Sequence, residues 1–245
     1  MPALIFDCDG VLAETERDGH LPAFNHVFAE LGVPLHWTEA VYADRLRIGG
    51  GKERVRASLT PDLLAAAGVN PDELDAWVSR LHARKTEIFT EIVSKGDLKA
   101  RPGVLRLVDE AREAGWALAV ASTSSETSVR AILDHAIGRN RASEFSVFAG
   151  DVVPRKKPDG AIYELALGEM AVKPEECVAI EDSRNGLLAA VAAGIRCVVT
   201  VSHFTQGERF DEAALIVGNL NDAAGPVTLS DLERLLEVRP RSGEG

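Results

Sequence analysis

The sequence contains few cysteines, and these few are poorly placed for pairing. Cys8, Cys177 and Cys197 are widely separated, odd in number, and each lies in an apolar segment. Such cysteines are typical of buried free thiols rather than of disulfides or a metal site. The pattern therefore fits a reducing compartment.

Long apolar runs are also missing. No run approaches the ~18 residues that a membrane-spanning helix requires, and no charged leader followed by a long apolar stretch opens the sequence. We therefore expect a cytoplasmic protein, or a protein of the chloroplast stroma if a transit peptide has been removed.

Basic residues are in the minority. Lys and Arg number 27 against 38 Asp and Glu, which gives a formal net charge of −11. An acidic surface repels nucleic-acid phosphates and anionic lipids, so we expect neither nucleic acid nor a membrane as partner. A small anionic substrate would need a local group of cations or a metal ion.

The sequence does contain a regular alternation of two patterns. Short apolar runs rich in β-branched residues predict buried strands, and segments with apolar residues every three or four positions predict helices. Their alternation predicts an α/β fold, with a Rossmann-like parallel sheet covered on both faces. The predicted strands are 3–6, 116–121, 146–150, 177–181 and 195–201. The predicted helices of this part are 103–115, 126–138, 159–170 and 184–194, and a polar tail covers 239–245.

The first strand is separated from the second by about a hundred residues of mainly helical pattern, notably 20–32 and 71–93. A crossover between parallel strands needs only about a dozen residues. We therefore predict an inserted helical cap at 14–99, and a core formed by 1–13 and 100–245.

Polar residues follow the predicted strands. Ligands bind at the carboxyl ends of the strands in an open parallel sheet, so these side chains are candidates for one site. They are Asp7 and Asp9, Ser122 to Ser125, Lys156 and Lys157, and Glu181 and Asp182. Converging carboxylates favour Mg²⁺, and lysine and serine supply donors to phosphate oxygens. The set therefore indicates phosphoryl transfer.

Each element alone has an ordinary structural explanation. Asp7-Cys8-Asp9-Gly10 is compatible with a turn, Ser122 or Ser124 with a helix cap, and Asp182 with another cap. The two lysines before Pro158 are compatible with a solvated loop. Only their order along the chain favours a site.

The segments LIFDCDGVL, LAVASTSS, RKKPDGAIYELAL and VAIEDSRNGLLAAVAAG resemble the four motifs of the haloacid dehalogenase superfamily. The resemblance implies Asp7 as the nucleophile that forms an aspartyl phosphate, and Asp9 as the acid and base. It implies Ser122 and Lys157 as ligands of the transferring phosphoryl group. It also implies Mg²⁺ on Asp7, the Asp9 backbone carbonyl, Glu181 and Asp182. An acid at position 9 would need a raised pKa, so we expect one there.

The predicted cap resembles that of the β-phosphoglucomutase-like phosphatases, and its AETE and IGGGKER segments resemble the CbbY-like group. The resemblance to this group implies a phosphatase of the Calvin cycle that removes one phosphate from xylulose 1,5-bisphosphate. The implied substrate-binding residues are Glu14, His20, Gly51, Lys52, Arg54 and Ser124. The glycines and the two cations of IGGGKER would bind a second phosphate.

Two other readings remain open. A mutase of the β-phosphoglucomutase kind would return the phosphoryl group to a sugar, and a signalling receiver domain also pairs an acceptor aspartate with acidic Mg²⁺ ligands. We expect a monomer, because a cap that opens and closes must be free to move.

Overall fold

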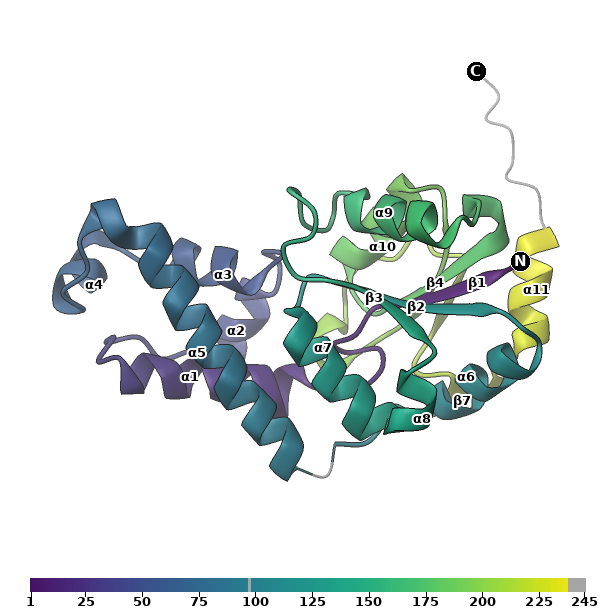
Figure 1. The fold of residues 1–245 in the computed structure, drawn as a ribbon, viewed down its shortest axis with the longest axis horizontal. Helices are drawn as coiled ribbons and strands as arrows, with labels where there is room; N and C mark the ends of the chain where they lie inside the picture. Colours follow the sequence, from purple (N-terminus) through teal and green to yellow (C-terminus); the bar gives the residue numbers. More distant parts are fainter. Residues whose placement is uncertain (97, 238–245) are drawn as a thin grey trace, which may run out of the picture.

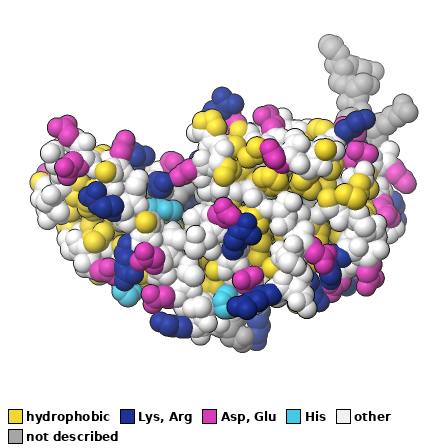
Figure 2. Space-filling model, in the orientation of Figure 1, with side chains coloured by type: hydrophobic (Ala, Val, Ile, Leu, Met, Phe, Trp, Pro, Cys, Tyr) yellow, Lys and Arg dark blue, Asp and Glu magenta, His cyan; other side chains and the backbone are white. Residues whose placement is uncertain are grey.

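The computed structural model describes residues 1–96 and 98–237, so the predicted tail lies outside the described residues. Figure 1 shows two parts, a sheet between helices and a group of helices beside it. Figure 2 shows acidic and basic side chains interspersed over one face of both parts.

The sheet has six parallel strands in the order β3-β2-β1-β4-β5-β6. The strands are β1 Ala3–Phe6, β2 Ala117–Ser122, β3 Phe145–Ala149, β4 Cys177–Glu181, β5 Arg196–Thr200 and β6 Leu215–Val217. The predicted α/β fold is confirmed, and the strand bounds agree to within one residue. Strand β6 was not predicted, because three partly exposed residues at a sheet edge carry no clear alternation.

Strand β1 lies between β2 and β4, where the strand order reverses. Successive side chains of a strand point to opposite faces, and both faces of β1 are buried. Leu4 and Phe6 lie in one apolar cluster, and Ala3 and Ile5 lie in the other. The carboxyl end of β1 therefore opens at the switch point, where ligands of such sheets bind.

Helices cover both faces of the sheet (Figure 1). One side carries α6 Val104–Glu113, α7 Glu126–Ile132, η3 Leu133–Gly138 and α11 Leu229–Glu237. The other carries α9 Ala161–Met170 and α10 Arg184–Ala192. Shorter elements are α8 Arg139–Ala142, η4 Pro174–Glu176, η5 His203–Thr205, β7 Asn221–Asp222 and β8 Gly225–Pro226.

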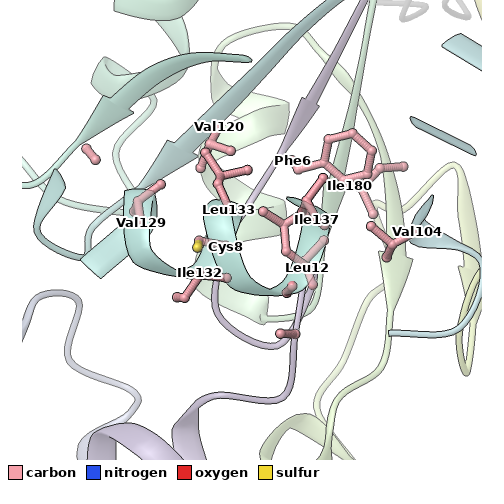
Figure 3. Close-up of a cluster of buried hydrophobic side chains, with 14 of the residues drawn as sticks. Phe6, Cys8, Leu12, Val104, Val120, Val129, Ile132, Leu133, Ile137 and Ile180 are labelled. Atoms are coloured by element: carbon pink, nitrogen blue, oxygen red, sulfur yellow. The ribbon is translucent and has the colours of Figure 1, made fainter. Parts of the chain in front are cut away.

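Figure 3 shows one apolar cluster, in which Cys8 lies among Leu12, Val129 and Ile132. All three cysteines are buried and free, as predicted. None of the helices in the described residues combines the length and the apolar character that a membrane span requires.

The helical part begins with η1 Glu16–His20, α1 Leu21–Glu30, α2 Glu39–Arg45 and α3 Gly51–Ser58. It continues with α4 Pro61–Ala66, η2 Pro71–Glu73 and α5 Leu74–Lys95. Phe24, Phe28, Trp37 and Tyr42 stack and tilt against one another in its interior, with ring centroids 4.8–6.2 Å apart. This aromatic cluster gives the helices an apolar centre of their own.

The chain enters and leaves the helical part through two neighbouring segments. Ala13 and Ala100 form an antiparallel bridge, and the Arg101 backbone N–H donates to Leu12 O over 2.9 Å. The Arg101 side chain is buried and donates to carbonyl oxygens of Gly10, Thr200, Val201 and Gly218. The cap at 14–99 remains our proposal for the extent of this part.

Candidate active site

The carboxyl edge of the sheet and the cap helices enclose a cavity of about 630 Å³. The core contributes Asp7, Asp9, Ser122, Thr123, Ser124, Lys157 and Asp182 to its wall. Residues of the helical part that line it include Glu16, Leu46, Arg47, Gly49 and Arg54. Predicted site residues that follow four separate strands therefore line the same cavity.

Lys157 links two of the carboxylates. Its Nζ donates to Asp7 Oδ1 over 2.7 Å, to Glu181 Oε1 over 2.6 Å and to Ala121 O over 2.8 Å. Its side chain is only 6% exposed, and nearby Asp7 and Glu181 raise its pKa although burial opposes this. Lys157 is therefore a fixed ammonium beside Asp7.

Asp7, Glu181 and Asp182 form a group that fits a metal ion. Each offers one carboxylate oxygen, and these oxygens lie within 4.8 Å of one another. Glu181 Oε2 is buried and has no hydrogen-bond partner among the described residues. Hard divalent cations such as Mg²⁺ prefer this kind of oxygen set, so the residues present fit the implied ion.

The charges of this group also favour a cation. Burial raises the pKa of Asp7 to about 8, with Glu181 and Asp9 adding to the effect and Lys157 opposing it. Burial, with the nearby Asp7 and Glu181, raises the pKa of Asp182. A bound cation would relieve this repulsion and keep Asp7 ionised. The implied contribution of the Asp9 backbone carbonyl remains a prediction, and the Asp9 carboxylate does not belong to this group.

Gly10 makes room for the group. Its φ is +78°, a conformation that glycine adopts without strain. A Cβ at this position would lie 2.2 Å from Asp182 Oδ2. The glycine of the DCDG segment therefore serves both the turn and the close approach of Asp182.

Asp9 faces a different set of partners, although it lies two residues from Asp7. Its carboxylate accepts hydrogen bonds from Thr15 Oγ1, from Ser124 Oγ over 2.5 Å and from His20 Nε2 over 2.8 Å. Lys85 Nζ contacts His20 Nδ1. An ammonium group can only donate, so Nδ1 accepts and the protonated Nε2 donates to Asp9.

The charge state of Asp9 contradicts our expectation of a raised pKa. Burial acts in that direction, but the hydrogen bonds from His20, Ser124 and Thr15 outweigh it and hold the pKa well below its usual range. Three donors around one carboxylate stabilise the ionised form. The prediction was wrong because it counted the nearby acids and not the hydrogen-bond donors around Asp9.

The capping alternatives for the serines and for Asp182 are resolved. Ser125 caps α7 by accepting from Ser128 N, and Ser183 caps α10 by accepting from Gly186 N. Ser122 and Ser124 instead line the cavity, and the Ser124 N–H donates to Ser122 Oγ over 3.1 Å. Asp182 likewise faces the cavity.

The basic segment of the cap is split in two. Arg54 lines the main cavity, where its side chain donates to Ile48 O over 2.9 Å and to Tyr42 Oη over 3.4 Å. Lys52 lies outside that cavity, and Gly51 lies against His82. We had expected Lys52 and Arg54 to bind one phosphate together. The structure instead places only Arg54 at the main cavity.

Glu14 also lies away from the expected place. Its Oε1 is 3.1 Å from Arg101 Nε, and it lines a separate cavity of about 480 Å³ beside the cap connection. Glu16 occupies the main cavity instead and accepts a hydrogen bond from Tyr42. The buried guanidinium of Arg101 accounts for the position of Glu14, because it needs a nearby carboxylate.

Several residues of the site were missed by sequence reasoning: Thr15, Glu16, Tyr42, Lys85 and Tyr163. Tyr163 donates to Glu181 Oε1 over 2.5 Å. Lys85 did carry a signal, because it falls four residues after Leu81 and four before Phe89, on the buried stripe of α5. A lysine on such a stripe needs a partner inside the protein.

Comparison with known proteins defines the class. Residues 1–194 match the family model of the haloacid dehalogenase-like hydrolases. The chain therefore belongs to this family, as its motifs predicted.

Its relatives narrow the class further. A protein of Arabidopsis thaliana named CBBY-like protein is 45% identical over 90% of this chain and 69% of its own length. The crystal structure of CbbY from Rhodobacter sphaeroides in complex with phosphate has a TM-score of 0.83 at 38% identity, and covers 95% of this chain and 100% of its own. A variant of the same protein in complex with xylulose-(1,5)bisphosphate has a TM-score of 0.80 at 39% identity, over 92% and 99%.

A third relative, the phosphorylated carbohydrates phosphatase of Thermotoga maritima, is 33% identical over 97% of this chain and 98% of its own. The prediction of a phosphatase is confirmed, and the chain is a CbbY-like member of its family.

Proposed function

We propose that the protein is a Mg²⁺-dependent sugar-phosphate phosphatase that acts through an aspartyl phosphate on Asp7. Its proposed substrate is xylulose 1,5-bisphosphate or a related sugar bisphosphate. The observation that carries the proposal is the contact of Lys157 with Asp7 beside the acidic group of Glu181 and Asp182. The complex of the similar CbbY with xylulose-(1,5)bisphosphate supports the substrate class.

In the first step, a carboxylate oxygen of Asp7 attacks phosphorus and the bond from phosphorus to the sugar oxygen breaks. The Lys157 ammonium lies beside Asp7 and offers a positive charge to the phosphoryl oxygens. Ser122, 2% exposed at the wall of the same cavity, supplies a hydroxyl donor. Asp7, Glu181 and Asp182 would hold Mg²⁺, which supplies charge neutralisation that lets a carboxylate approach a phosphate.

Asp9 performs the proton transfers of both steps. It first takes a proton from solvent and gives that proton to the leaving sugar oxygen. It later removes a proton from the water that hydrolyses the aspartyl phosphate. The donors around Asp9 keep it ionised in this structure, which is the state of a base. The acid step therefore requires the substrate to alter the contacts of Asp9 with Ser124 or Thr15.

A phosphate-release assay tests this function. The purified protein with Mg²⁺ should release phosphate from xylulose 1,5-bisphosphate faster than from ribulose 1,5-bisphosphate and from hexose and pentose monophosphates. Chelation with EDTA should abolish the release, and added Mg²⁺ should restore it. Formation of an isomeric sugar phosphate without phosphate release would identify a mutase instead.

The cellular setting remains part of the proposal. We place the protein in the cytoplasm or the chloroplast stroma of a cell that uses the Calvin cycle. There it acts as a monomer on a small sugar phosphate, with no nucleic-acid or membrane partner. Detection of xylulose 1,5-bisphosphate accumulating in cells that lack the protein would support this placement, and unchanged levels would contradict it.

A further inference from the structure

Tyr163 of α9 is a fully buried residue that contacts two side chains of the reaction centre. Its hydroxyl donates to Glu181 Oε1 over 2.5 Å. Lys157 Nζ lies 5.1 Å from the centroid of its ring and donates to the same Glu181 oxygen over 2.6 Å. Tyr163 does not line the main cavity, so it acts on the reaction centre through these neighbours.

The two carboxylate oxygens of Glu181 differ in their partners. Oε1 accepts from both Tyr163 and Lys157, whereas Oε2 is buried and has no hydrogen-bond partner among the described residues. A buried oxygen without a hydrogen bond is costly, so a further ligand is expected there. The Glu181 carboxylate lies beside those of Asp7 and Asp182. The arrangement therefore keeps one oxygen occupied and leaves the other for the metal ion or for a water bound to it.

The first turn of α10 restricts the same carboxylate. A Cβ at Gly186 would lie 1.9 Å from Glu181 Oε2, so the glycine gives this oxygen its space. The helix thus packs closely against Oε2, while two donors hold Oε1. A carboxylate confined in this way has little freedom to turn, and the orientation of metal ligands depends on such surrounding groups.

Building on the function proposed above, we propose that Tyr163 is a positioning residue for Mg²⁺, because its hydroxyl holds Glu181 Oε1 and so keeps Oε2 available to the ion or to a water on it. Lys157 cannot fill this role alone. Its ammonium group has three donors, and all three are engaged, with Asp7, Glu181 and Ala121. A phosphoryl group bound beside Asp7 draws one of them away, and Tyr163 then remains on Oε1.

Tyr163→Phe tests the proposal, because it removes the hydroxyl and keeps the buried ring. The binding of Mg²⁺ to the full chain is measured by calorimetry, together with the melting temperature. The Kd of Mg²⁺ should rise by about tenfold, since losing a group that orients a metal ligand weakens metal binding to this extent. The Mg²⁺ concentration for half-maximal phosphate release should rise in parallel, whereas kcat at saturating Mg²⁺ should change little. An unchanged Kd of Mg²⁺ would overturn the proposal.

Tyr42→Phe is the matched control. Tyr42 and Tyr163 are the two tyrosines of the chain, both are fully buried, and each donates to a carboxylate. The acceptor of Tyr42 is Glu16, which does not belong to the metal group, so this variant should leave the Kd of Mg²⁺ unchanged. A similar rise in both variants would show a general loosening of the protein and would overturn the proposal.

A double-mutant cycle with Glu181→Gln identifies the route by which Tyr163 acts. In the Glu181→Gln background, Tyr163→Phe should raise the Kd of Mg²⁺ by less than about twofold, because the two residues act as one unit. A further rise of about tenfold in that background would mean that Tyr163 acts through another group, which contradicts the proposal. Weaker Mg²⁺ binding by Tyr163→Phe, in a protein whose native form binds Mg²⁺ but releases no phosphate, would uphold the positioning role and contradict the proposed function.

Discussion

The two walls of the main cavity are built in different ways. On the sheet side, Asp7, Ser122 and Asp182 lie on or directly after strands whose registers are fixed by their neighbours. On the cap side, Glu16 and Arg54 project from helical segments that pack through aromatic and apolar side chains. The rigid wall carries the reacting groups, and the helical wall carries groups that can vary without disturbing the sheet.

The same contrast separates the two aspartates of the first motif. Asp7 is buried among acids, and its pKa is raised to about 8. Asp9 is buried among three hydrogen-bond donors, Thr15, His20 and Ser124, and its pKa is lowered. Burial alone therefore does not decide the charge of either residue. Burial and the neighbouring acids raise the pKa of Asp7, and the hydrogen-bond donors lower that of Asp9.

The largest effect is expected from a change on the sheet side. Asp7→Asn should lower the rate of phosphate release by at least about 10³-fold, since the amide is not a nucleophile. The melting temperature and the binding of substrate should be retained. Asp134→Asn, at an exposed position, is the control. Near wild-type turnover of the Asp7 variant would refute its role.

A change on the cap side should have a smaller effect on the same reaction. His20→Ala removes a donor to Asp9 and the partner of Lys85, so kcat should fall by about 10²-fold with a lesser change in KM. His26→Ala, on the exposed face of α1, should leave kcat unchanged. If KM rises by about 10²-fold and kcat does not change, His20 binds substrate and does not support Asp9.

The smallest effect is on stability and concerns His82 of α5. Burial, with the nearby Lys85, Lys52 and His20, lowers its pKa from 6.5 to about 3. Between these pH values the unfolded chain binds a proton at His82 that the folded protein does not bind. The free energy of unfolding should therefore fall as the pH is lowered from about 6.5 toward 3.

His82→Gln should reduce the loss of stability between pH 7 and pH 5 by about 2 kcal/mol, as measured by chemical denaturation at the two pH values. The exposed His36→Gln is the control. If the two variants lose stability equally between these pH values, His82 does not titrate as described.

The sheet side could be predicted from the sequence because the end of each apolar run marks the end of a strand. The apolar runs before Asp7, Ser122 and Asp182 end within a residue of the observed strands. Parallel topology then brings the strand ends together without further information.

The cap side could not be predicted to the same depth. Glu14 and Glu16 stand two positions apart, and no periodicity indicates which of them faces the cavity, because the π-helix η1 starts only at Glu16. The contacts of Lys52 with Asp151 and of Lys85 with His20 join residues far apart in the chain. Such contacts depend on how the helices dock, which a local pattern does not contain.

The bridge between Ala13 and Ala100 has a consequence for protein engineering. The two ends of the helical part are hydrogen-bonded neighbours, so a turn of about two to five residues is long enough to join them. The intervening residues form an exchangeable cassette, since a helical segment from a related enzyme can be spliced in at the same two positions. Chimeras of this kind would keep the chemistry of one parent and take the preferred sugar from the other.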